Sequence, residues 1–317
     1  MFNGLWKVWD ERSPLTIPGT TYTLKGWSIA ALRTNFYIKE LGIMLDAGLS
    51  ANISPGHIFV THGHSDHSCN LPFHLYSTKE DQRIQVYVPA ESLKYFRDYI
   101  GAAYSITTEK KFDENLSCGC DIIPVEIEQT KRKGYIQSIL SNYFTDKLSN
   151  IILEYSETGR IPLIINKKSI DVEIIKCYHS IPCVGYGFTE KRKRLKNEYV
   201  NLPGKDIAAL RKTGIEVSRD VDIPFFCYLG DTSQEVLKDP KLLKYSTIQI
   251  ECTFLLPTEL EQAYSTRHMH IDHLKPFIIA HPEITFILYH FSQRYQKAEI
   301  AEFFTRLDIK NIIPWIN

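Results

Sequence analysis

The chain has 317 residues, enough for one large α/β domain with a substantial core. Its 37 Lys and Arg balance 37 Asp and Glu, which excludes attraction of a polyanion by overall charge and leaves that role to local patches. No N-terminal stretch has the pattern of a signal peptide, and no run approaches the ~18 apolar residues that a membrane span needs. Seven scattered cysteines are typical of free thiols in a reducing compartment. We therefore expect an intracellular protein, in the cytoplasm or else the nucleus, that does not contact the membrane.

Short runs rich in apolar and β-branched residues predict strands, and the first of them follow one another closely enough to form hairpins. Apolar residues three and four apart predict an amphipathic helix over residues 91–100. Strands that alternate with helices imply a layered α/β architecture. Residues 129–160 are basic and then helical in pattern, and we interpret them as an insertion over the site. The expected strands lie at 22–29, 35–38, 42–48, 57–60, 86–89, 170–178 and 225–232.

The densest group of metal-ligand residue types directly follows the apolar stretch 57–60. His62 and His64, two positions apart, point the same way from an extended backbone and can bind one cation. Asp66 and His67 continue around the turn and can face a second cation beside the first. Zinc suits this mixture of imidazole and carboxylate, although manganese or iron also accepts it. The density of ligand types favours a metal site over a polar surface turn.

Further candidates stand where other predicted strands end. Asp46 ends an apolar run and precedes Ala47-Gly48, where an aspartate commonly caps a turn. His179 follows the strand at 170–178, and Asp231 ends the apolar strand at 225–232. Taken alone, a single histidine such as His179 is more often structural than a metal ligand.

The order of these motifs resembles a known superfamily. The pattern His62-x-His64-x-Asp66-His67 resembles the signature of the metallo-β-lactamase superfamily. Three later segments resemble ribonuclease Z, the tRNA 3′-processing endonuclease within it, and the matches together run from Asp46 to Tyr295. They are His179-Ser180-Ile181-Pro182-Cys183-Val184-Gly185-Tyr186, Glu251-Cys252-Thr253-Phe254 and Tyr289-His290-Phe291-Ser292-Gln293-Arg294-Tyr295.

This resemblance implies a four-layered αββα sandwich in a single domain over residues 1–317, with insertions at 129–160 and 190–222. It also implies two Zn²⁺ ions, with Mn²⁺ or Fe²⁺ as alternatives, and a bracing role for Asp46. Asp231 would be shared between the two ions. The remaining ligands would divide into His62, His64 and His179 for one ion, and Asp66, His67 and His290 for the other.

Two cations ~3.5–4 Å apart lower the pKa of a bridging water and clamp the oxygens of a phosphoryl group. The leaving oxygen also needs a proton, and His268 matches by order the non-ligand histidine of the family. Glu251 would orient and charge His268. His270 is the rival for this role, and a helix start with surface histidines is the structural alternative. The candidate catalytic residues are thus Asp66, which is also a ligand, together with His268 and Glu251.

The implied reaction is removal of the 3′ trailer from a tRNA precursor, which leaves a 3′-hydroxyl on the tRNA. The implied partners are this RNA and a second copy of the chain, whose arm would hold the substrate. The family's Gly-Pro arm element is not plainly present after His179. Instead, the basic run Lys191, Arg192, Lys193 and Arg194 is either a shortened arm that contacts phosphates, a solvated face or a nuclear localisation signal.

Three other functions compete with this prediction. A small-molecule metallohydrolase, such as a lactonase, thiolesterase or cyclic nucleotide phosphodiesterase, shares all the ligand positions, but His268, Glu251 and the closing motif favour the nuclease. A nuclease with a large inserted cap needs more residues than lie between Asp231 and His290. A decayed nucleic-acid-binding protein would have lost a ligand, and none is missing.

Overall fold

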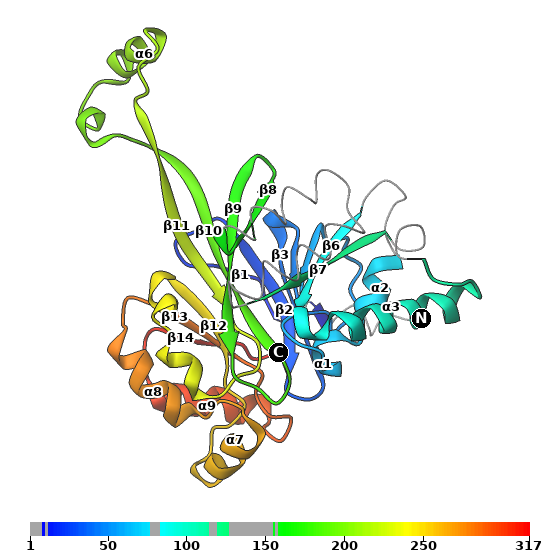
Figure 1. Ribbon diagram of the computed structural model, residues 1–317. Coiled ribbons are helices and arrows are strands. Elements are labelled where there is room, and N and C mark those ends of the chain that lie inside the picture. The colour runs from blue at the N-terminus through cyan, green and yellow to red at the C-terminus, as the bar shows by residue number, and fades with distance from the viewer. Residues whose placement is uncertain (1–7, 10–11, 77–82, 114–118, 127–154, 156–157) are drawn as a thin grey trace.

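The computed structural model describes residues 8–9, 12–76, 83–113, 119–126, 155 and 158–317, and shows two seven-stranded sheets packed face to face (Figure 1). In each sheet the spatial order of the strands follows their order in the chain. The first sheet contains β1 (Leu15–Thr16), β2 (Thr23–Ile29), β3 (Arg33–Ile38), β4 (Ile43–Leu45), β5 (His57–Phe59), β6 (Ile84–Pro89) and β7 (Cys120–Val125). The second contains β8 (Arg160–Ile165), β9 (Lys168–Cys177), β10 (Cys183–Leu195), β11 (Ser218–Tyr228), β12 (Thr247–Glu251), β13 (Thr285–Tyr289) and β14 (Ile312–Pro314).

Both sheets begin antiparallel and end parallel. Strands β1 to β4 pair antiparallel, as do β8 to β11, whereas the later neighbours in each sheet pair parallel. Parallel neighbours require longer crossover connections, and those connections hold most of the helices. The helices are α1 (Ser65–Ser68), α2 (Leu71–Tyr76), α3 (Leu93–Thr108), α6 (Gly204–Lys212), α7 (Leu260–Thr266), α8 (Ile271–Ala280) and α9 (Lys297–Leu307). Short 3-10 turns lie at Lys39–Leu41, Ala90–Ser92, Asn197–Tyr199, Gln234–Lys238, Pro240–Lys244 and Pro257–Glu259.

Three hydrophobic clusters separate the layers. The cluster between the sheets is rich in aromatic residues, including Phe36, Phe59 and Tyr186. A second cluster packs α2 and α3 on the outer face of the first sheet, and a third packs α8 and α9 on the outer face of the second sheet. Three packed interfaces require four layers, so the predicted αββα sandwich is confirmed.

Most expected elements occur close to their expected bounds, with two clear differences. Helix α3 continues to Thr108, beyond the predicted end at residue 100, because its last turns bury no side chain after Gly101 and so carry no apolar periodicity. Strand β11 begins at Ser218 rather than at residue 225, because its first half leaves the sandwich and is half-exposed or exposed.

That first half of β11 belongs to a protruding arm. Strands β10 and β11 pair from Tyr186 and Tyr228 out to Leu195 and Ser218, whereas β9 pairs with β10 only as far as Lys191. Figure 1 shows the resulting two-stranded ribbon, with α6 at its tip, extending away from both sheets. The insertion expected at 190–222 coincides with this arm. The one expected at 129–160 lies outside the described residues, apart from Tyr155 and residues 158–160.

Among the helices that the structure describes, none combines the length and the apolar content of a membrane span.

Candidate metal centre

The candidate ligands meet at one edge of the sandwich, beyond the carboxyl ends of strands from both sheets. His62 and His64 follow β5, and Asp66 and His67 lie in α1 directly after them. The other three follow β9, β11 and β13 of the second sheet, and they are His179, Asp231 and His290. All seven therefore come together where the two sheets meet, although the role of each in binding metal stays a prediction.

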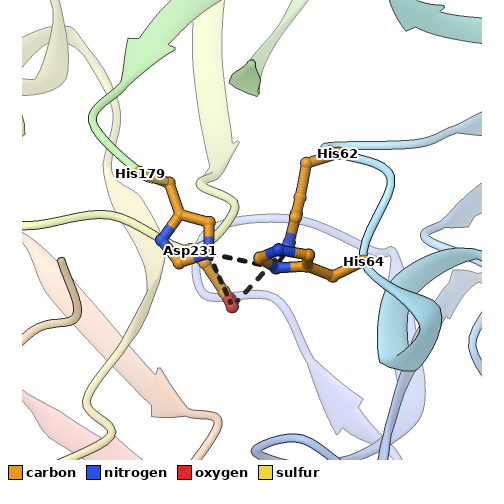
Figure 2. Close-up of side chains that lie close together, drawn as sticks. All are labelled: His62, His64, His179 and Asp231. Carbon is orange, nitrogen blue, oxygen red and sulfur yellow. Dashed lines mark hydrogen bonds and ion pairs between the residues drawn. The ribbon is translucent and has the colours of Figure 1, made fainter. Parts of the chain in front are cut away.

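His62, His64, His179 and Asp231 form the first group, drawn in Figure 2. His64 Nδ1 lies 3.2 Å from His62 Nε2 and 3.2 Å from His179 Nε2. Oδ2 of Asp231 lies 3.7 Å from His62 Nε2 and 4.0 Å from His179 Nε2. Zinc–nitrogen bonds of ~2.0–2.1 Å at tetrahedral angles place ligand nitrogens about 3.3–3.4 Å apart. These imidazoles therefore converge at the spacing that one such cation requires.

The second group shares Asp231 and adds Asp66, His67 and His290. His67 Nε2 lies 3.3 Å from His290 Nε2 and 3.3 Å from Oδ1 of Asp231. Oδ2 of Asp66 lies 3.3 Å from His290 Nε2. Oδ1 of Asp231 is buried and, apart from this approach of His67, makes no hydrogen bond among the described residues, which is unfavourable unless a cation or water occupies the space before it. The donor set thus fits two neighbouring cations.

The outer ring nitrogens hold most of the histidines in place. Nδ1 of His67 lies 2.7 Å from Asp46 Oδ2, and Nδ1 of His62 lies 3.0 Å from Thr61 Oγ1. Nδ1 of His179 lies 3.1 Å from the carbonyl oxygen of Arg267. A hydrogen bond donated from Nδ1 leaves the Nε2 lone pair facing the cluster, as ligand histidines require. Burial lowers the pKa of His62 and of His179, which favours the neutral imidazole that binds metal.

Asp46 braces the metal loop as predicted, without facing the cluster itself. Its carboxylate is buried and accepts hydrogen bonds from Thr61 N at 2.7 Å, from Tyr228 Oη at 2.6 Å and from His67. Its φ of 58° is in the left-handed region, which costs a non-glycine residue backbone strain. His290, with a φ of 64°, has the same conformation. The close set of partners around both residues holds these strained positions.

His268 and Glu251 form a largely buried ion pair beside the ligands. Nδ1 of His268 lies 2.8 Å from Glu251 Oε1 and 3.8 Å from Asp231 Oδ2. Glu251 also accepts hydrogen bonds from the backbone amides of Thr232 and Met269, at 2.9 and 3.1 Å, which hold its carboxylate fixed. Burial alone would lower the pKa of His268, but the attraction of Glu251 outweighs it and raises that pKa to about 9. This shift favours the protonated imidazole, and its Nε2 is the nitrogen not bound to Glu251.

His270, the rival candidate, has a structural role. It caps the start of α8, where its Nδ1 accepts a hydrogen bond from the amide of Asp272, and its Nε2 lies 2.9 Å from the carbonyl oxygen of Leu256. Both ring nitrogens are thus engaged away from the cluster. The helix start suggested as the structural alternative therefore exists: His270 caps it and His273 lies in its first turn, whereas His268 precedes it.

Two residues at the site were missed by sequence reasoning. Thr253 Oγ1 lies 2.6 Å from Glu251 Oε2 and 3.1 Å from His290 Nδ1, and so links the ion pair to a ligand. Because Thr253 lies in the Glu-Cys-Thr-Phe segment that resembles ribonuclease Z, that resemblance could have pointed to it. Arg267 donates from its guanidinium to the carbonyl oxygen of His179 at 3.0 Å, in addition to accepting from that ring. No sequence pattern connects these two residues.

The cations of the basic run lie on the arm, and most are paired with carboxylates. Lys191 lies 2.9 Å from Asp171, Arg192 lies 2.6 Å from Glu190, and Lys193 lies 3.6 Å from Glu216. Arg194 is exposed. This pairing leaves less free charge than the sequence alone indicates.

No protein-family model matches the chain. Curated relatives do match it over nearly its whole length. The chain is 26% identical to a chloroplastic tRNase Z of Arabidopsis thaliana over 303 residues, which cover 93% of this chain and 75% of that protein. It is 25% identical to a second tRNase Z of Arabidopsis thaliana over 92% of both chains. The predicted resemblance to ribonuclease Z is confirmed. Among solved structures, the short form of human tRNase Z is 18% identical, covers 86% of this chain and 92% of its own, and has a TM-score of 0.49.

Proposed function

We propose that the chain is a metal-dependent endoribonuclease that removes the 3′ trailer from tRNA precursors. The observation that carries this proposal is the charged His268–Glu251 pair placed beside two ligand groups that share Asp231. This arrangement combines a proton donor with a site for a phosphodiester. Similarity to tRNase Z proteins over nine-tenths of the chain supports tRNA as the substrate class.

The residues that would hold two Zn²⁺ ions are the two groups described above, and Asp66 would contribute to catalysis as one of these ligands. When bound, such a pair of cations lowers the pKa of water between them and offsets the charge of the phosphoryl oxygens. The chain itself would hold each imidazole in the tautomer that leaves a lone pair facing the cluster. Burial of these rings would disfavour protonation of the nitrogens that bind the ions.

His268 would act at the bond that breaks. Hydrolysis that leaves a 3′-hydroxyl on the tRNA breaks the bond between phosphorus and the 3′ oxygen, so this oxygen must gain a proton. The protonated imidazole of His268 would donate it from Nε2, while Glu251, bound to Nδ1, holds the ring and stabilises its positive charge. The trailer would retain the phosphate.

The arm would contact RNA phosphates outside the site. Lys191, Arg192, Lys193 and Arg194 line its base, and exposed Lys205, Arg211 and Lys212 stand on α6 at its tip. Such contacts contribute affinity without reading sequence. A second copy of the chain could offer its arm to the same substrate.

The test is turnover by zinc-reconstituted protein on two substrates, a tRNA precursor with a 3′ trailer and bis(p-nitrophenyl) phosphate. We expect cleavage of the precursor at the 3′ end of the mature tRNA, leaving a 3′-hydroxyl. Activity on the small diester alone would overturn the tRNA assignment while retaining the phosphodiesterase site. Activity on neither would overturn both.

A further inference from the structure

A cavity opens beside the candidate metal centre, and its walls are mostly apolar, whereas the ligand cluster is polar. Its volume is about 520 Å³, within the ~300–1,000 Å³ typical of small-molecule sites. Most of its lining is apolar or aromatic, and the residues that matter here are Gly63, Tyr95, Phe96, Tyr99, Ile181 and Pro182. The mechanism proposed above assigns no role to this cavity.

The cavity reaches the metal loop itself. Gly63 stands between the candidate ligands His62 and His64, and a Cβ placed on it would lie 3.8 Å from Ile181 Cδ1 and 3.9 Å from Phe96 Cζ. The base of the cavity is thus the backbone that joins two ligands. A group held there lies against that backbone.

The outer wall is a pair of tyrosines on one face of α3. Tyr95 and Tyr99 are four residues apart, so their side chains neighbour each other on the helix surface. Tyr99 is fixed by a hydrogen bond from its hydroxyl to the carbonyl oxygen of Cys69 at 2.5 Å. Tyr95 is 71% exposed, which is unusual for so large an aromatic ring. Two exposed rings side by side form a surface on which a planar aromatic group can stack.

The position of His268 decides which nucleotide this surface faces. His268 and Tyr178 line a different cavity, of about 310 Å³, whereas Ile181 and Pro182 line the aromatic one. The segment that carries His179 therefore separates the two cavities. The leaving 3′ oxygen belongs on the side of His268, so the nucleotide that keeps the phosphate belongs on the other side.

We propose that the aromatic cavity between α3 and the Ile181-Pro182 segment binds the unpaired base of the first trailer nucleotide, with Tyr95 as its stacking platform. This inference rests on the proposed function for the identity of the RNA. Stacking tolerates any base, because every base has a π-face, so the cavity selects an unpaired nucleotide without selecting a sequence.

The closing experiment separates the cavity from the tRNA assignment. The zinc-reconstituted protein is given p-nitrophenyl thymidine 5′-phosphate, which keeps a nucleoside on the retained phosphate, and methyl p-nitrophenyl phosphate, which has no base. We expect kcat/KM to favour the thymidine ester by roughly tenfold or more, because base–aromatic stacking contributes on that scale. Tyr95→Ala should remove most of this preference, and Tyr95→Phe should keep it. Ile106→Ala, at an 82% exposed position on the same helix outside the cavity, is the matched control and should keep it as well.

A tRNA precursor that lacks the base of its first trailer nucleotide is assayed in parallel with the intact one. Equal kcat/KM for the two small esters, or a preference that survives Tyr95→Ala, would overturn the proposed cavity even if the intact precursor is cleaved. A preference that depends on Tyr95 without precursor cleavage would retain the cavity and overturn the tRNA assignment. Cleavage of the abasic precursor as fast as the intact one would show that the cavity does not act on RNA.

Discussion

At the scale of single residues, the histidines of the site differ in how their surroundings shift their pKa. Burial lowers the pKa of His62 and of His179. Neighbouring carboxylates outweigh burial at His67 and His268 and raise the pKa of both rings. Glu251 itself is saturated with hydrogen-bond donors and is buried, so it is not free to rotate toward a cation. Identical side-chain types thus differ in pKa through the balance between burial and neighbouring carboxylates.

Replacing His268 with Ala should therefore abolish most turnover while leaving the cation sites intact. We expect kcat to fall by roughly 10²–10⁴, the contribution typical of a general acid. Zinc measured by atomic absorption should remain near two per chain, since the variant keeps both ligand groups. The control is His281→Ala, at a partly exposed position paired with Glu283, which should match the wild type. Loss of zinc from His268→Ala would instead identify His268 as a ligand or a structural residue.

A second prediction concerns His74, which is buried in α2 with its Nε2 3.1 Å from the carbonyl oxygen of Leu49. Burial lowers its pKa from 6.5 to about 4. Between these values the unfolded chain binds a proton that the folded chain does not, so the free energy of unfolding decreases as the pH falls. One pKa unit corresponds to ~1.4 kcal/mol, which gives a loss of about 2 kcal/mol between pH 7.5 and 5.

Urea unfolding of chelator-treated protein at these two pH values checks this expectation. His74→Gln retains a hydrogen-bond donor but cannot titrate, and it should lose about 2 kcal/mol less than the wild type on acidification. His281→Gln should lose as much as the wild type. If His74→Gln and the wild type lost the same free energy of unfolding on acidification, the lowered pKa of His74 would be contradicted.

At the scale of elements, the site depends on how closely the strand ends approach α1. Gly48 follows β4, and its amide donates to the carbonyl oxygen of Thr34 at 2.9 Å. A Cβ on Gly48 would collide with the carbonyl group of Asp66 and lie 2.8 Å from that of Thr34. Both obstacles are backbone atoms, which cannot rotate away. Only glycine allows α1 to hold Asp66 and His67 where they stand.

Gly48→Ala should accordingly displace α1 and weaken the second ligand group. We expect the free energy of unfolding to fall by ~1–3 kcal/mol, as for an overpacked core, and zinc content to drop below that of the wild type. Gly56→Ala is the matched control, because a Cβ there meets nothing within 4 Å. Wild-type stability and zinc content in Gly48→Ala would show that the backbone relaxes at little cost.

The elements also show which features of the site could be predicted from the sequence. His62, His64, Asp66 and His67 were recognisable as candidates from their density directly after an apolar strand, whereas His179, Asp231 and His290 were assigned through the resemblance of their segments to the family. The contact of Tyr228 with Asp46, 182 residues away, was not predictable, because neither residue carries a signal for the other. The same applies to the aromatic cavity, since Tyr95 and Ile181 come from different sheets' connections and meet only in the folded chain.

At the scale of the whole molecule, the arm is the feature that departs furthest from a compact sandwich. The sequence showed the cations of the arm but not their carboxylate partners. Asp171 reaches Lys191, and Glu216 reaches Lys193, only because β9, β10 and β11 pair with one another. Salt-bridged cations release fewer counterions on meeting RNA than free ones do. Lys205, Arg211 and Lys212 on α6 have no ion pair in the part of the chain that the structure describes.

We therefore expect the two groups of cations to differ in how RNA affinity depends on salt. Replacing Lys205, Arg211 and Lys212 with Gln should reduce the slope of log affinity against log salt by up to ~0.7–0.9 for each phosphate that these side chains neutralise. Replacing Lys191, Arg192, Lys193 and Arg194 with Gln should weaken binding but reduce the slope by less per charge. Filter binding of a tRNA precursor between about 50 and 200 mM salt measures both. An unchanged slope in both variants would show that the arm does not bind phosphates.

The chain order of the strands has a consequence for how the molecule can be assembled. Among the described strands, none of β1 to β7 pairs with any of β8 to β14, so a break between Val125 and Arg160 would leave every ladder whole. The resulting fragments would divide the ligand set into His62, His64, Asp66 and His67 on one polypeptide and His179, Asp231 and His290 on the other. Neither fragment alone would contain a complete two-cation centre. Reassembly of the two fragments could then be followed by measuring metal that binds only when both are present.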